Sequence, residues 1–393
     1  MTGKFIGEID SKNVNVPLFD MSIKNIKITG NDDTIHLNSF GFIGDSRVSI
    51  NSNMQNELNG KPKINSLNIK MDTLNNNILI EQLTKTHKAM NTNNSIKNID
   101  LSRLSVKNGT VDINEVIVKD LKANNLEAKF SINEDGLLFA DTLKINVGKG
   151  KIEGQSSYNL NDRTMISDFS LNNVDANYVA ETLFDAKNQI YGNANGKIYL
   201  KTKGSTNKEM IENLSGAIYF DMADGKMPKL GSLEYLLRAS NIFKSGITSF
   251  SLNNILEILN LVKTGHFSNI NGQAIINNGL VENIEIFSQG ENMSLYIHGN
   301  FDILNTHADM EILGNLSKRI STFLGSVGNA SINSFFKIIP GISMLDFGRK
   351  DIIENIEKIP SFSNGKYEAK TFQAIINGNI NESGYVQSFK WVE

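Results

Sequence analysis

The chain has 393 residues and a formal net charge of −3, and its 40% of hydrophobic residues supports a folded core and argues against disorder. With 39 basic and 42 acidic residues, it shows no electrostatic basis for binding nucleic acid. Cysteine is absent, which excludes disulfides, thiolate catalysis and cysteine-based zinc sites.

The first seventy residues read as short strands separated by glycine, asparagine and aspartate turns. Turn chemistry is concentrated at residues 30–33, 44–45 and 59–62. The pattern therefore predicts strands over residues 4–9, 23–29, 34–43, 47–53 and 64–71. No charged segment followed by an apolar core marks a signal peptide, and no apolar run is long enough for a membrane-spanning helix.

The first expected helix covers residues 78–90, and the polar residues 91–98 after it are typical of a linker. We therefore expect an N-terminal β-repeat segment over residues 1–95, a central β segment over 96–204 and a C-terminal β region with helical insertions over 205–393.

Strands resume at residue 101 and continue to about residue 174, with predicted turns at 108–109, 134–136 and 148–150. Leu126, Phe130 and Ile132 alternate with polar residues, and so do Ile145 and Val147. This period of two predicts a sheet with one apolar and one solvated face.

The second half adds short helices to the strands. We expect helices over residues 176–187 and 207–214, and apolar helical patterns over 230–244 and 253–263. The glycine-rich residues 192–197 are interpreted as a turn, because they lead into a strand and not into the helix that a phosphate-binding loop requires.

Residues 216–227 and 272–281 resemble each other. Each reads as a strand that ends in an Asp-Gly or Asn-Gly turn and starts another strand, which predicts two hairpins. Further strands are expected over 281–288, 293–301, 308–313, 371–377 and 386–392. Between them, residues 321–345 carry a single charge, at Lys337, and are expected either to pack against the sheet end or to meet a bilayer surface.

No catalytic constellation stands out, so we expect no enzyme activity, no cofactor and no metal. His298 and His307, with Asp302 and Asp309, are a conceivable metal site, but the spacing lacks a third ligand and solvent-facing strand residues are the preferred interpretation. The remaining histidines, His36, His87 and His266, are scattered. Nucleophile elbows, zinc helices and P-loops are missing, and nothing selects one carboxylate pair for glycoside hydrolysis.

Three stretches in order resemble the AsmA-like family of bacterial envelope proteins, which includes TamB- and YhdP-type members. They are MISDFSLNNVDANYVAETL at 165–183, IYGNANGKIYLKTKGSTNKEMIENLSGAIYFDMADGKM at 190–227, and FSNINGQAIINNGLVENIEIFSQGENMSLYIHGNFDILNTHADMEI at 267–312. The likeness covers roughly residues 101–393. It implies an elongated, curved, mainly antiparallel β-sheet groove with a hydrophobic trough, built of repeated strands and hairpins, with short helices clustered in the C-terminal half.

The resemblance further implies a periplasmic protein that binds or transfers phospholipid between inner and outer membranes and supports outer-membrane homeostasis. Its partners would be acyl chains, one or both membranes and other envelope proteins, and its inner-membrane anchor would lie on sequence outside this chain. An outer-membrane assembly scaffold and a β-helical surface protein acting on glycans are the alternatives. The alternating residues expected to line the groove are Val111, Ile113, Leu126, Phe130, Ile132, Leu143, Ile145, Val147, Ile198, Leu200, Ile218, Phe220, Ile284, Ile286, Leu295, Ile297, Phe301 and Ile303.

Overall fold

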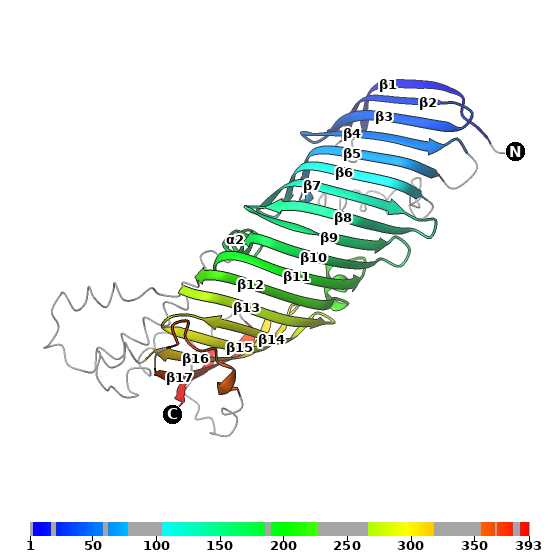
Figure 1. Cartoon of the computed structure of the whole chain (residues 1–393). Helices are drawn as coiled ribbons and strands as arrows, with labels where there is room; N and C mark the ends of the chain where they lie inside the picture. The colour runs from blue at the N-terminus through cyan, green and yellow to red at the C-terminus, as the bar shows by residue number, and fades with distance from the viewer. Residues whose placement is uncertain are drawn as a thin grey trace, which may run out of the picture. The chain divides into compact units, whose positions relative to one another are not determined.

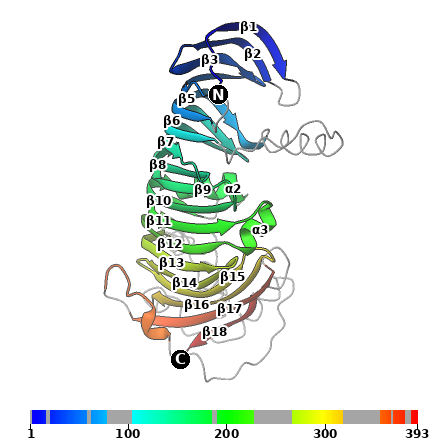
Figure 2. The same ribbon diagram turned by 90° about the vertical axis from the view of Figure 1, so that its right-hand side faces the viewer.

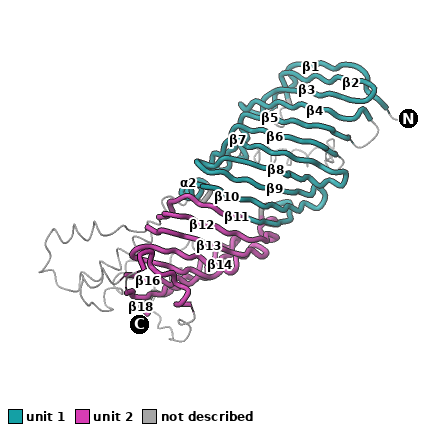
Figure 3. The backbone as a smooth tube through the Cα atoms, in the orientation of Figure 1, with its two compact units in different colours: residues 1–185, 198–206 teal, residues 186–197, 207–393 magenta. Residues whose placement is uncertain are grey.

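The computed structural model describes residues 3–16, 21–57, 62–77, 104–184, 190–226, 266–317, 355–365, 368–379 and 386–392. Eighteen strands in these ranges form an open, mostly antiparallel sheet (Figure 1), which confirms the mainly β fold class. The chain divides into two compact units, coloured separately in Figure 3. The first unit is Met1–Asp185 with Ile198–Thr206, and the second is Ala186–Lys197 with Asn207–Glu393.

The first unit is a run of strands in which each pairs with the next one along the chain. They are β1 (Gly7–Val16), β2 (Met21–Gly30), β3 (Thr34–Ile43), β4 (Ser46–Gln55), β5 (Lys63–Asn75), β6 (Ser105–Val118), β7 (Leu121–Ile132), β8 (Leu137–Val147), β9 (Gly150–Asn159) and β10 (Thr164–Asp175), followed by helix α2 (Ala176–Phe184). All these pairs are antiparallel except β5 with β6. Parallel neighbours need a long connection, and β6 begins only at Ser105, well after β5 ends at Asn75.

The second unit continues the same arrangement with antiparallel neighbours (Figure 2). Its strands are β12 (Ser215–Lys226), β13 (His266–Asn277), β14 (Leu280–Gln289), β15 (Met293–Asp302), β16 (His307–Ser317), β17 (Ala369–Asn379) and β18 (Val386–Val392), with helix α3 (Asn207–Glu212) and the 3-10 turn η4 (Ile356–Lys358). Strand β11 (Tyr191–Lys203) contributes residues to both units.

Most predicted strands and turns are confirmed. The turns at 134–136 and 148–149 separate consecutive strands, and α2 and α3 begin at the predicted residues 176 and 207. Asn278 and Gly279 join β13 to β14 with φ values of 50° and 80°, as the hairpin signal predicts.

Three predicted turns are wrong, because their glycines lie inside strands. Gly109 lies in β6, residues 192–197 in β11 and Gly225 in β12. A Cβ at Gly109 would overlap with the ring of Phe130, and one at Gly192 would overlap with the side chain of Met222. These glycines leave room for a neighbouring side chain, so they do not mark chain reversal.

Other predictions concern residues outside the described ranges: the helices at 78–90, 230–244 and 253–263, the linker at 91–98 and the near-neutral stretch at 321–345. The clustering of short helices in the C-terminal half therefore stays a prediction. So does the boundary between residues 95 and 96.

β-Bulges keep the apolar residues on one face where the simple alternation fails. Between the pairs Asn124–Asn146 and Glu127–Lys144, β7 advances by three residues and β8 by two. Asn125 takes up the extra residue with a φ of 54°. Ala123 and Ala128 therefore face the same side, although they are five positions apart and a regular strand would place them on opposite faces. Asn283 has the same role in β14, with a φ of 49°.

Candidate functional site: the apolar face of the sheet

In the first unit, the predicted lining residues are brought to one face by the strand register. Val111 pairs with Ala128, which pairs with Leu143, and residues directly opposite in an antiparallel ladder point to the same side. The same registers pair Ile113 with Leu126. We call this side the apolar face. It carries eight of the predicted residues: Val111, Ile113, Leu126, Phe130, Ile132, Leu143, Ile145 and Val147.

In the second unit, one row of direct partners crosses the strands from Phe220 through Gly272, Ile286 and Ile297 to Ile312. We use the name apolar face for this side as well. It carries seven of the predicted residues: Ile218, Phe220, Ile284, Ile286, Leu295, Ile297 and Phe301.

The registers do not place the last three predicted residues. Ile198 and Leu200 lie on β11, where both are half-buried and alternate with Tyr199, which is 47% exposed. Ile303 follows the end of β15, in a turn where the Asp302 carboxylate accepts hydrogen bonds from the Leu304 and Asn305 amides.

Burial of the apolar face is uneven. Five of the predicted residues are buried, namely Ile113, Ile132, Val147, Ile284 and Leu295. The other thirteen are half-buried and none is exposed. A sealed core would bury nearly all of them, so the described face keeps apolar surface accessible along most of its strands.

Two small clusters pack on the apolar face of the first unit. In one cluster, Ala123, Val147 and Val174 are buried and the α2 residues Tyr178 and Val179 pack against them. The Tyr178 hydroxyl also accepts a 2.9 Å hydrogen bond from the Lys122 amide and donates a 3.0 Å bond to its carbonyl. Ile145 packs in this cluster too, so α2 covers the part of the face nearest to it.

The second cluster is centred on Ile64, Val106 and Ile132, with Phe130 and Leu138 packed against it. Along β8, Leu138 belongs to this cluster and Ile145 to the one beside α2. Leu143 lies between the two and is half-buried. The stretch of face around Leu143 is therefore the best candidate for contact with a ligand.

The opposite face of the first unit is charged. Lys70 lies 3.6 Å from Asp112, its direct partner across the strands, and Lys144 lies 3.8 Å from its own partner Glu153. A hydrogen bond from Lys151 is the main cause that lowers the pKa of Glu153. All these side chains are substantially exposed, so the pairs favour solubility of this face more than stability.

Part of the opposite face of the second unit, over β14–β16, is covered by the segment at residues 355–363. Tyr296, Leu313 and Ile359 form a buried cluster there, and Phe287 stacks on Tyr296 with ring centroids 4.9 Å apart. The Ser363 amide donates a 3.1 Å hydrogen bond to the Gly290 carbonyl.

A polar network fastens this segment to the sheet. Glu285 accepts hydrogen bonds of 2.9 Å from both Gln273 and the Tyr296 hydroxyl, and Lys358 lies 3.5 Å away from it. These bonds, led by that from Gln273, lower the pKa of Glu285. Burial raises the pKa of Tyr296, and the hydrogen bond to Tyr296 raises that of Lys358. The network is structural, because Lys358 of the segment ties it to Glu285 and Tyr296 of the sheet.

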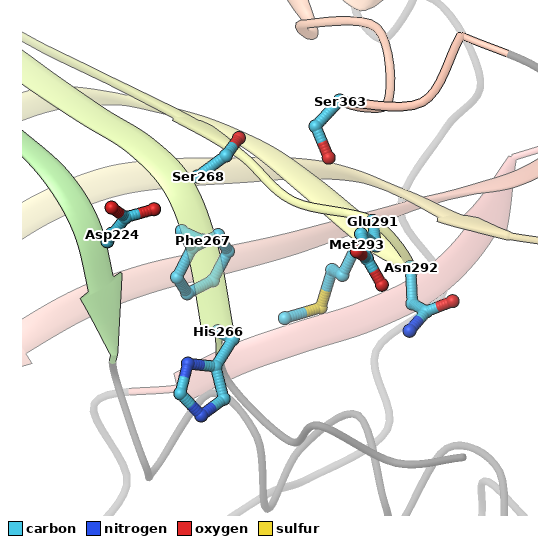
Figure 4. A pocket seen from close by; sticks show the side chains of 8 residues that line it. All are labelled: Asp224, His266, Phe267, Ser268, Glu291, Asn292, Met293 and Ser363. Atoms are coloured by element: carbon cyan, nitrogen blue, oxygen red, sulfur yellow. The ribbon is translucent and has the colours of Figure 1, made fainter.

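The histidines and acids do not assemble into a metal site in the described ranges. His298 binds Glu311 at 2.6 Å on the covered face, and His307 lies opposite Asp302 at the start of β16. His266 lines a cavity of about 260 Å³ at the strand ends of the second unit, with Phe267 and Met293 as its apolar walls (Figure 4). The full lining is Asp224, His266, Phe267, Ser268, Glu291, Asn292, Met293 and Ser363.

Sequence reasoning missed several members of the apolar face. Leu121, Ala123 and Val174 are buried there. Ala123 lies two residues before the bulge at Asn125, where the period of two is broken. Met222 and Ile270 are almost wholly buried on the same face of the second unit. Continuing the alternation of Ile218 and Phe220 by one step would have identified Met222.

No helix in the described ranges is long and apolar enough to cross a membrane. Comparisons of the chain with protein-family models, with curated proteins and with solved structures found no match. The resemblance to the AsmA-like family thus stays a prediction from the sequence.

Proposed function

We propose that this protein binds the acyl chains of lipids along the apolar face of its sheet and shields them from water during transfer. The observation that carries the proposal is the strand register, which brings fifteen of the predicted lining residues to the apolar faces of the two units. Most of them are only half-buried.

The energetics favour such a role. Moving a methylene group from an apolar surface into water raises its free energy by about 0.8 kcal/mol. Exposing two long acyl chains to water therefore costs on the order of 20 kcal/mol. A face that stays apolar from strand to strand lets a chain move sideways without paying most of that cost. Lipid transfer makes and breaks no covalent bond, so the proposal needs no catalytic group.

The proposed setting is the space between two membranes of a bacterial envelope, and the proposed ligand is a phospholipid. The ion pairs on the opposite face of the first unit support an aqueous environment for that face. Closure of the apolar face into a curved groove is part of this proposal.

A photo-crosslinking experiment tests the proposal on matched positions. Phe130 lies on the apolar face, whereas Phe139, on the next strand, pairs with Ser131 on the opposite face and is 40% exposed. Benzoylphenylalanine in place of Phe130 should capture phospholipid from liposomes, and the same residue in place of Phe139 should not. Equal capture at both positions, or none at Phe130, would refute the proposal.

A further inference from the structure

Three phenylalanine rings on the apolar face each lie over a glycine of the neighbouring strand. Phe130 is the direct partner of Gly109, Phe220 of Gly272 and Phe372 of Gly314. In each case the nearest atoms to a Cβ built on the glycine would belong to the partner's ring.

The ring, and not the backbone, requires glycine at these positions. Other glycines of the chain have positive φ values, for example Gly148 at 60° and Gly279 at 80°. Gly109, Gly272 and Gly314 have none, so their backbone suits any residue. A side chain is missing there because the phenylalanine ring occupies its place, as in the pairing of aromatic residues with glycines in other sheets.

A ring that lies over the neighbouring strand does not stand up from the sheet. An alanine at Gly109 would fill the space beneath the Phe130 ring and force it outwards into the region above the apolar face. An acyl chain that crosses several strands would then meet a step. A short chain could lie on one side of that step.

We propose that Gly109 and Gly272 determine specificity by keeping the apolar face level, so that it accepts long acyl chains that cross several strands. This inference rests on the proposed lipid binding and adds the length of the chain as the property recognised. Phe130 and Phe220 are half-buried and within reach of a ligand, whereas Phe372 is fully buried.

The test compares palmitate and octanoate binding to the whole chain and to its Gly109→Ala variant. We expect Gly109→Ala to weaken palmitate binding by a little more than about tenfold, because lost contact with about two methylene groups, at about 0.8 kcal/mol each, slightly exceeds the 1.4 kcal/mol of a tenfold change. Octanoate binding should change less than about twofold. The double variant Gly109→Ala/Phe130→Leu should restore palmitate binding, since the smaller leucine leaves room for the added methyl group.

Gly314→Ala is the matched control. It makes the same steric change beneath a ring that no ligand reaches, so it should lower the melting temperature without altering the preference for palmitate. If Gly109→Ala does not fold, Gly272→Ala with Phe220→Leu as its restoring partner carries the same test. Equal losses for both fatty acids, or unchanged palmitate binding, would overturn this inference alone. A wild-type chain that binds neither fatty acid would overturn the proposed function with it.

Discussion

Leu143→Asp is the substitution that tests the accessible part of the apolar face most directly. Leu143 is half-buried between the two clusters of the first unit, and its partners across the strands are Ala128 and Gly154. A carboxylate there keeps its own water and holds an acyl chain away from the sheet. The ladder hydrogen bonds use backbone atoms, so the substitution leaves them in place.

The expected loss of lipid affinity follows from the area that the chain gives up. Contact with two to three methylene groups, at about 0.8 kcal/mol each, amounts to roughly 2 kcal/mol, or about a thirtyfold weaker binding. The cost in folding stability should be about 1 to 2 kcal/mol, because the leucine is only partly buried.

The control is Phe139→Asp, on the same strand but on the opposite face. Both variants should keep the circular dichroism spectrum of a β protein. Titration with a fluorescent phospholipid should then show weak binding for Leu143→Asp and unchanged binding for Phe139→Asp. If both variants bind like the wild type, or both lose binding equally, the apolar face is not the lipid site.

Leu295 is fully buried, so Leu295→Ala should lower the free energy of unfolding measured by urea titration by about 3 kcal/mol. Ile275 is 50% exposed on the other face, so Ile275→Ala should lower it by less than about 1 kcal/mol. Glu285 has its pKa lowered, first by the hydrogen bond from Gln273, so its contribution to stability is present above the ordinary value of 4.5 and is lost as the pH falls through the lower folded value. Glu285→Gln should therefore flatten the acid side of the stability profile measured by urea midpoints, and an unchanged profile would contradict this assignment. Tyr178→Phe removes both hydrogen bonds to the backbone of β7. Amides of α2 should then exchange faster with deuterium, and the free energy of unfolding should fall by about 1 kcal/mol. Unaltered exchange would show that α2 is held by its apolar contacts alone.

Strand positions were predictable because two independent signals agree in this chain. Alternation such as that of Leu126, Phe130 and Ile132 identifies the strand and its faces, and turn residues such as Asn278 and Gly279 mark its end. Among the described strands, every antiparallel neighbour is also the next strand in the chain, so the pairing follows from chain order. The shared face of the predicted residues follows from the same local pattern.

Glycine was the main source of error, because it has two physical uses in a sheet that look alike in sequence. At Gly148 it allows a positive φ in a turn, and at Gly109 it makes room for a ring on the next strand. Deciding between them requires the register, since Phe130 is twenty-one residues away from Gly109 in the chain. The bulges raise the same difficulty. Asn125 is typical of a turn in sequence, but in the structure it lies at a bulge within β7.

The two units differ in how much of their sheet is covered, and this difference suggests where a ligand would bind. In the second unit, Leu295 on the apolar face and Leu313 on the other face are both fully buried, so β15 and β16 are packed on both sides. In the first unit, the face opposite the apolar one carries exposed ion pairs, and the apolar face around Leu143 is only half-buried. Local stability increases with the number of buried contacts, so we expect the amides of β15 and β16 to be strongly protected from hydrogen exchange. The proposed acyl chain needs accessible apolar surface, so we expect it to bind to the first unit.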